Sequence, residues 1–193
     1  MILSFFKKDL LNRLEIIKFK SKTKCKLSKG IELMNSDVIE LGKNVSIGEN
    51  SKILCWVEYT SGISIQKLNP SLSIGDNFKA TSSLLIQCAG KIIIGNNVLI
   101  GRNVSIIDYN HGTDPLTTNY LDNDLIPKSI IIEDGSWIGN NTIILSGTHI
   151  GKKCIIGAGS VVTTSIEDYS IAVGNPAKVI KKFDFDSNTW TKV

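Results

Sequence analysis

The chain has 193 residues, of which 42% are hydrophobic and 21% charged, and its formal net charge is +4 at pH 7. This composition fits one folded domain and argues against a disordered or fibrous chain. No RNP-like or zinc-finger pattern occurs, so we expect no nucleic-acid partner. The four cysteines are far apart and form no CxxC pair, which predicts reduced thiols in a cytoplasmic protein.

Residues 1–30 form a basic N-terminal cap in which nine lysines and arginines outnumber Asp9 and Glu15. The spacing of four apolar residues predicts a short amphipathic helix that caps one end of the domain: Phe6, Leu10, Leu14 and Ile17. The lysines are expected to face water, with contact to a membrane surface or an anionic substrate as the alternative.

The first apolar run is too short for a signal peptide, because Lys7 and Lys8 follow directly. No apolar stretch approaches the length of a membrane span, so we expect no stable membrane insertion. We therefore predict a cytoplasmic protein, with a peripheral position at the inner face of the membrane as the variant that the basic segment would allow.

A six-residue repeat organises residues 31–167. From Ile132 the chain reads IEDGSW, IGNNTI, ILSGTH, IGKKCI, IGAGSV and VTTSIE, and each block begins with an aliphatic residue. The same register appears from Leu41, from Ile74 and again from Ile94. The breaks, at about residues 54–73, 80–91 and 107–131, are interpreted as insertions or irregular coils.

A period of six is neither the 3.6 of a helix nor a simple strand alternation. It predicts short strands joined by tight turns, with the first aliphatic residue pointing inward and Gly or Asn where the backbone bends. Three blocks would close one coil of about eighteen residues, and stacked coils would bury a continuous aliphatic column. The spacing thus predicts an all-β solenoid. Residues 168–193 leave the repeat and are expected to cap the other end or cross to a neighbouring subunit.

Only two histidines are present, which narrows the search for a catalytic base. His149 takes the sixth position of a repeat block, a position that points outward elsewhere, so we expect a surface or interface side chain. His111 instead opens a long polar loop, DYNHGTDP, after a run of perfect repeats. Binding residues commonly collect on such a loop where it leaves a rigid scaffold.

Together, the hexapeptide blocks, the IIDYNHGTDP loop, the GSWIGNN coil, the IGAGSVVT run and the VGNPAKVI tail resemble hexapeptide-repeat acetyltransferases. The branch that they resemble contains the maltose and galactoside O-acetyltransferases and those of capsule and lipopolysaccharide biosynthesis. The resemblance covers about residues 38–182. It implies a left-handed parallel β-helix, a homotrimer, and acetyl-CoA bound as co-substrate in a groove between neighbouring solenoids.

By this resemblance His111 is the general base that takes the proton from an acceptor hydroxyl, and a neutral imidazole has suitable basicity near pH 7. Asp108 or Asp114 would orient the ring, although either can equally be a loop-turn residue. The thiolate of CoA is a good leaving group, so no covalent acyl-enzyme is required. The implied reaction is acetyl transfer to a sugar hydroxyl in surface polysaccharide biosynthesis.

The resemblance also implies a set of residues that border the cofactor. Near the pantetheine arm it implies Asn140, Ser146, Gly147, Gly157, Ala158, Thr163 and Thr164, each of which is also an ordinary repeat position. Lys178 and Lys181 align with residues that meet the nucleotide phosphates, and Trp137 aligns with an aromatic near the active site or packs at the trimer interface. Family members often carry lysine at the position of Thr164, so that phosphate contact is either absent here or supplied by Lys152 or Lys153.

The acceptor side departs from the family pattern. Galactoside enzymes place an acidic residue shortly before the IGNNVLIG coil, where this chain has residues 87–91, QCAGK. The main alternative is therefore an N-acetyltransferase of an amino sugar, free or nucleotide-linked. A γ-type carbonic anhydrase would need three histidines for zinc, so no metal is expected. A purely structural solenoid is disfavoured by the His111 loop.

Overall fold

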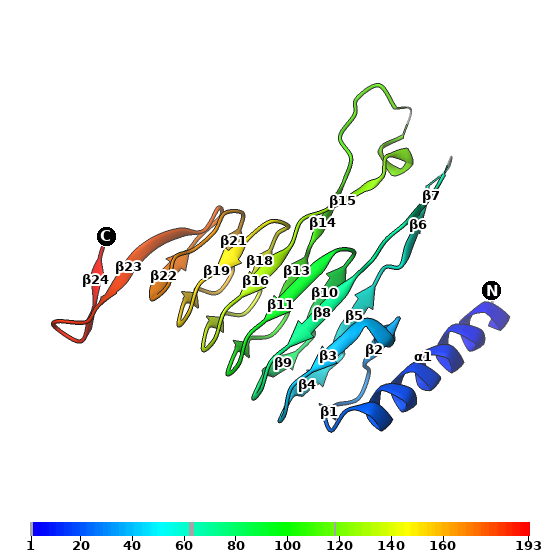
Figure 1. Cartoon of the computed structure of the whole chain (residues 1–193), viewed down its shortest axis with the longest axis horizontal. Coiled ribbons are helices and arrows are strands. Elements are labelled where there is room, and N and C mark those ends of the chain that lie inside the picture. Colours follow the sequence, from blue (N-terminus) through cyan, green and yellow to red (C-terminus); the bar gives the residue numbers. More distant parts are fainter. Residues whose placement is uncertain (1, 62–63, 118) are drawn as a thin grey trace.

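The computed structural model describes residues 2–61, 64–117 and 119–193, with side chains from residue 9 onward. It is an elongated stack of coils with helix α1 (Ile2–Lys22) at one end and strand β24 (Thr189–Lys192) at the other (Figure 1). Three mainly parallel sheets run along the stack and form its three faces. The all-β solenoid that the six-residue period predicts is confirmed.

The nine-stranded sheet contains, in order, β1 (Lys26–Leu27), β4 (Ser46–Glu49), β9 (Lys79–Ser82), β12 (Leu99–Ile100), β17 (Trp137–Ile138), β20 (Ile155–Ile156), β22 (Ser170–Val173), β23 (Lys178–Asp184) and β24. The six-stranded sheet contains β2 (Glu32–Met34), β5 (Lys52–Cys55), β10 (Leu85–Cys88), β13 (Ser105–Ile107), β18 (Ile143–Ile144) and β21 (Val161–Val162). The five-stranded sheet contains β3 (Ile39–Leu41), β8 (Ser71–Ile74), β11 (Lys91–Ile94), β16 (Ile130–Ile132) and β19 (His149–Ile150).

The core is the aliphatic column that the repeat predicts. The first residues of the six C-terminal blocks all have 0% exposure: Ile132, Ile138, Ile144, Ile150, Ile156 and Val162. Parallel pairing keeps them in register, so that Ile138 pairs with Ile156 and Ile144 with Val162. Each coil therefore buries its apolar side chains against the next coil, which is why an isolated block would not be stable.

Asparagines at the turns explain the polar part of the repeat. Asn44, Asn77 and Asn97 occupy left-handed backbone conformations with φ of 57°, a region that asparagine tolerates better than most residues. Their side chains also bond to one another along the stack: Asn44 donates to Asn77 over 3.1 Å, and Asn77 donates to Asn97 over 3.0 Å. The turn residues thus add a side-chain ladder to the backbone ladder.

One expected break is wrong, because residues 80–91 form a regular coil. They contain most of β9 and all of β10, and β10 pairs in parallel with β5 and β13. Ala80 takes the inward position six residues after Ile74, and Ile86 follows six residues later with 0% exposure. The repeat continues here, but the small alanine does not stand out as a block start.

Helix α1 is 21 residues long rather than short, and its packed face differs from the expected one. Leu10, Leu14 and Ile17 are 58%, 54% and 65% exposed, and the Phe6 side chain lies outside the described part. Phe19, 1% exposed, enters the core instead. Asn12 donates to the carbonyl of Ile31 and accepts from the N–H of Leu33, each over 2.9 Å.

The packed face of α1 thus combines polar pairing with the edge of the first coil, whose unpaired strand groups need partners, with the apolar contacts of Ile16 and Phe19. Additional contacts run from Glu15 to Ser36 in the 3-10 turn η1 (Ser36–Val38). Within the described part of the chain, no helix is both long and apolar enough to cross a membrane.

At the other end of the stack, β22 pairs with β23 and β23 with β24 in antiparallel fashion. Four aromatic rings pack edge-to-face on this hairpin: Tyr169, Phe183, Phe185 and Trp190. They line a surface hollow together with Trp137. Residues 168–193 thus close the end of the stack.

Candidate active site

Two insertions leave the solenoid where the six-stranded sheet passes to the five-stranded sheet. The first insertion, residues 56–70, contains the hairpin of β6 (Glu58–Thr60) and β7 (Ile65–Lys67). The second insertion, residues 108–129, contains β14 (Tyr109–His111), the 3-10 turn η2 (Tyr120–Asp122) and β15 (Leu125–Pro127). Both project from the same side of the stack (Figure 1). We call this side, with its turns at residues 88–90, 145–148 and 163–165, the insertion edge.

His111 lies at the end of β14, where it is partly buried between the two insertions. Its ring packs edge-to-face on Tyr59 of β6, with 5.5 Å between ring centroids and 68° between ring planes. The Tyr59 hydroxyl is 3.5 Å from Nδ1 of His111 and donates a hydrogen bond to the Leu121 carbonyl. The loop that carries the predicted base is thus held by the other insertion.

The Asp108 side chain accepts hydrogen bonds from the turn before β11 rather than from the His111 ring. Its side chain is fully buried, with 0% exposure, and its carboxylate accepts the backbone N–H groups of Ala89 and Gly90 over 2.7 and 2.9 Å. The Cys88 thiol is 3.5 Å from the same carboxylate. Burial raises the pKa of Asp108 above its ordinary value, while these hydrogen bonds oppose the shift.

Asp114 lies in the exposed part of the second insertion and caps a local turn. Its carboxylate accepts the N–H of Leu116 over 2.9 Å, which is the loop-turn role considered from the sequence. Among the described residues, the hydrogen bond found for the His111 ring runs to Tyr59, and neither aspartate contributes one. Tyr59 is therefore a third candidate, beside Asp108 and Asp114, for the residue that orients the His111 ring.

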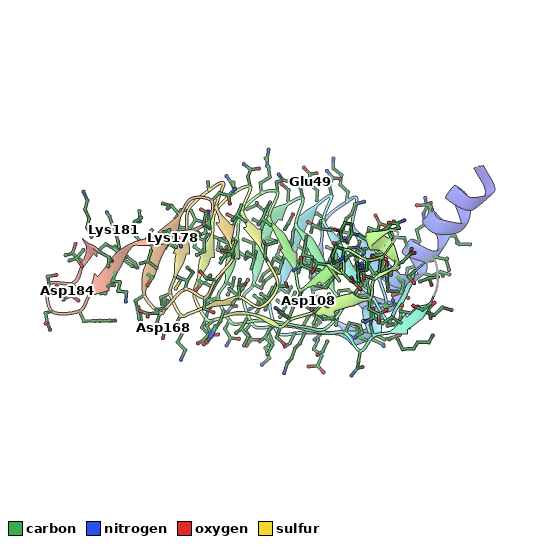
Figure 2. The ribbon with its side chains drawn as sticks, turned by 90° about the horizontal axis from the view of Figure 1, so that it is seen from above. Glu49, Asp108, Asp168, Lys178, Lys181 and Asp184 are labelled. Atoms are coloured by element: carbon green, nitrogen blue, oxygen red, sulfur yellow. The ribbon has the colours of Figure 1, made fainter. Side chains whose placement is uncertain are left out.

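The residues predicted to border the cofactor do not meet at one place in a single chain. Ser146, Gly147, Thr163 and Thr164 lie on the insertion edge, where Ser146 accepts a hydrogen bond from Asn110, next to His111, over 3.0 Å. Asn140, Gly157 and Ala158 lie at turns between the nine-stranded and six-stranded sheets. Trp137, Lys178 and Lys181 belong to the nine-stranded sheet, and Figure 2 shows Lys178 and Lys181 far along the stack from Asp108.

Some of these residues already have structural partners. The Asn140 side chain accepts the N–H of Arg102 over 2.8 Å, as an ordinary repeat asparagine would. Gly147 has φ of 80°, and its N–H donates to the carbonyl of Lys128 at the base of the second insertion. Trp137 is 50% exposed beside the aromatic hairpin. These positions are compatible with a ligand but are also explained by the coil itself.

His149 has the surface position that the repeat predicts. Its Nε2 lies 2.7 Å from a carboxylate oxygen of Glu133, which directly follows the neighbouring strand β16 of the five-stranded sheet. Among residues 9–61, 64–117 and 119–193, no group of three or more His, Cys, Asp or Glu side chains is placed to hold a metal ion.

Sequence reasoning missed Tyr59 and Gln66, which belong to the first insertion. Gln66 donates its amide to the carbonyl of Leu125 over 2.9 Å and accepts the N–H of Leu125 over 2.8 Å. Leu125 pairs directly with His111 across β14 and β15. The available signal was two short strand-forming runs, EYT and IQK, on either side of a Ser-Gly pair in the sequence, a pattern typical of a hairpin.

Comparisons with known proteins agree with this architecture. A family model described as bacterial transferase hexapeptide (six repeats) matches residues 129–164, and one described as hexapeptide repeat of succinyl-transferase matches residues 91–114. A maltose O-acetyltransferase structure from Clostridium difficile superposes with a TM-score of 0.59 at 28% identity, covering 83% of this chain and 67% of that one. The shared fold is the left-handed parallel β-helix.

Two relatives extend the match beyond the repeats. WbbJ of Escherichia coli, named as a lipopolysaccharide biosynthesis O-acetyl transferase, is 31% identical over 160 residues, which cover 77% of each chain. A Mycobacterium tuberculosis protein named as an acetyltransferase is 34% identical over 154 residues, which are 77% of this chain and 51% of that protein. The chain thus spans about half the length of the mycobacterial relative. With these matches, the chain belongs to the hexapeptide-repeat acetyltransferase family.

Proposed function

We propose that this protein transfers an acetyl group from acetyl-CoA to a sugar hydroxyl, with His111 as the general base. The observation that carries the proposal is the position of His111, held by two insertions on one edge of a rigid solenoid. Family membership and the name of WbbJ support acetyl transfer in the synthesis of a surface glycan. The maltose enzyme adds a second relative whose name specifies a sugar hydroxyl.

In the proposed reaction the acceptor hydroxyl loses its proton to the imidazole of His111 as its oxygen attacks the thioester carbonyl. The carbon–oxygen bond forms, the carbon–sulfur bond breaks, and the proton then passes from the imidazolium to the departing thiolate of CoA. Because the thiolate leaves readily, no acyl-enzyme is needed, and alignment of the two substrates supplies much of the rate.

We also propose that the working unit is a homotrimer. The residues predicted to border acetyl-CoA lie on two edges and one face of a single chain, so no one copy gathers them around His111. In a trimer, the insertion edge of one copy would meet another copy's outer surface. Light scattering coupled to size-exclusion chromatography tests this directly, and a monomer at micromolar concentration would contradict it.

The proposed cellular position is the cytoplasm, with a peripheral position at the inner face of the membrane as the variant that the basic segment would allow. This variant rests on the charge of residues 1–30, which contain nine basic and two acidic residues, and on the exposed leucines of α1. Lysines close to an anionic lipid surface contribute about 1 kcal/mol each.

The decisive experiment measures CoA thiol release with acetyl-CoA and a panel of free and nucleotide-linked sugars. His111→Ala is expected to lower turnover by about 10²–10⁴-fold. His149→Ala is the matched control, because that histidine bonds Glu133 at the surface, and its turnover should match wild type. Unchanged turnover in His111→Ala would overturn the assigned base.

The chemical nature of the product separates the two acceptor classes. An O-acetyl ester is cleaved by mild alkali, whereas the amide formed by an N-acetyltransferase is not. Alkali-labile acetate in the labelled product supports the hydroxyl acceptor. Alkali-stable acetate would replace it with the amino sugar considered from the sequence.

A further inference from the structure

The contact between Tyr59 and His111 bears on which nitrogen of the ring carries the proton, as well as on the position of the ring. A phenol carries one hydrogen, and the Tyr59 hydroxyl donates it to the Leu121 carbonyl. The 3.5 Å approach of the same oxygen to Nδ1 of His111 can then be a hydrogen bond only if Nδ1 is the donor. In a neutral ring the two nitrogens share one proton, so Nε2 is left with its lone pair free.

We infer that Tyr59 is a positioning residue that holds His111 in the Nδ1–H tautomer, which leaves Nε2 as the base. The inference deepens the proposed function and rests on it for its catalytic meaning. An aromatic hydroxyl from one insertion here takes the place of the carboxylate that often orients a catalytic histidine. Unlike a carboxylate, a neutral phenol sets orientation and tautomer without a charge that would stabilise the imidazolium.

The geometry around the pair supports this role. Gln66, seven residues after Tyr59 in the same hairpin, forms two hydrogen bonds with the backbone of Leu125, the residue paired with His111. The second insertion is therefore fastened to the first at two residues besides His111, at Leu121 by Tyr59 and at Leu125 by Gln66. Side chains locked in this way by a surrounding shell of hydrogen bonds can hold a catalytic group within a fraction of an ångström.

The groups that could compete for Nδ1 are engaged elsewhere. The Asp108 carboxylate is buried against the N–H groups of Ala89 and Gly90, and that of Asp114 caps its own turn. Among the described residues, Tyr59 is the side chain found in hydrogen-bond contact with the His111 ring. The tautomer therefore depends on this hydroxyl.

The test is a long-range ¹⁵N–¹H spectrum of the full chain labelled at histidine, recorded without acetyl-CoA at a pH where both rings are neutral. The chain has only two histidines, and His149→Gln assigns the signals. The Nε2 of His149 faces the Glu133 carboxylate over 2.7 Å and serves as an internal reference for the Nε2–H form. We expect His111 to show the opposite pattern, Nδ1–H.

Tyr59→Phe keeps the aromatic ring and removes only the hydroxyl. We expect the His111 signals to shift toward the Nε2–H form and kcat to fall about 10-fold, less than when the base itself is removed, with KM for acetyl-CoA unchanged. Tyr120→Phe is the matched control, because Tyr120 is an exposed tyrosine of the second insertion, and it should change neither the spectrum nor kcat.

An Nε2–H pattern for His111 in wild type, or an unchanged pattern in Tyr59→Phe, would overturn the inference. The wild-type spectrum decides even if Tyr59→Phe folds poorly. Because the spectrum involves no turnover, its failure would leave the His111→Ala result standing. Full activity of His111→Ala would instead refute the proposed function while leaving the tautomer measurement intact.

Discussion

Replacing Asp108 by alanine separates a structural role from a catalytic one. The buried carboxylate accepts two backbone N–H groups, from Ala89 and Gly90, which would remain buried without an acceptor in Asp108→Ala. A hydrogen bond to a charged group contributes about 1.5–3 kcal/mol. Burial raises the pKa of Asp108, which shows that the buried carboxylate carries a desolvation cost, and alanine removes this cost. This gain offsets part of the loss of the two hydrogen bonds, so we expect the free energy of unfolding to fall by about 3 kcal/mol.

For a chain of this size, about 1 kcal/mol shifts Tm by roughly 2–4 °C, so Asp108→Ala should unfold roughly 6–12 °C below wild type. The assay is thermal unfolding by circular dichroism at one fixed protein concentration, because assembly makes Tm concentration-dependent. The matched control is Asp114→Ala, whose exposed turn contact water can replace, with a loss below about 0.5 kcal/mol. A lower kcat with an unchanged Tm in Asp108→Ala would refute this reasoning and make Asp108 a partner of the reaction.

Phe19→Ala should lower the free energy of unfolding, measured in urea, by about 3–5 kcal/mol, because Phe19 enters the core. Leu14→Ala is the control and should lower it by less than about 0.5 kcal/mol. Equal losses in the two variants would contradict the observed packed face of α1. Burial raises the folded-state pKa of Asp108 above 3.8, so its contribution to stability falls as pH rises. The wild-type urea midpoint minus that of Asp108→Asn should therefore decrease from about pH 4 to pH 7, and a constant difference would argue against it. The full chain should sediment with phosphatidylglycerol vesicles and not with neutral vesicles. A variant carrying both Lys20→Glu and Lys24→Glu should bind the phosphatidylglycerol vesicles less. Equal binding of the wild type to both vesicle types would exclude an electrostatic contact between the basic segment and the membrane.

The six-residue register was enough to predict a β-solenoid, because each inward position must be apolar for the coils to stack, whereas the left-handed winding was implied only by the family resemblance. Ile132 to Val162 illustrate this, since every block start is buried. The register is less visible where a small residue such as Ala80 fills an inward position. The packed face of α1 was mispredicted because it includes the polar Asn12, which pairs with the first coil beside Ile16 and Phe19, and a search for apolar spacing does not count a polar residue.

The candidate site was only partly predictable. His111 stands out because the repeat breaks after it, but its partner Tyr59 is 52 residues earlier in the chain. Such a contact depends on both insertions leaving the same edge, which a local pattern does not specify. Asp108, adjacent in sequence to the loop, points back into the turn before β11. Proximity in sequence was therefore a poor guide to which side chains meet the imidazole.

The two ends of the stack determine how this molecule can grow. The parallel pairing of a solenoid does not by itself limit the number of coils, because the last coil always presents unpaired strand edges on which another coil could pair. Here α1 occupies the first edge through Asn12, and β23 and β24 reverse the strand direction at the last. The parallel register thus ends at a helix on one side and at antiparallel strands on the other, and covered or reversed edges of this kind disfavour end-to-end pairing between copies.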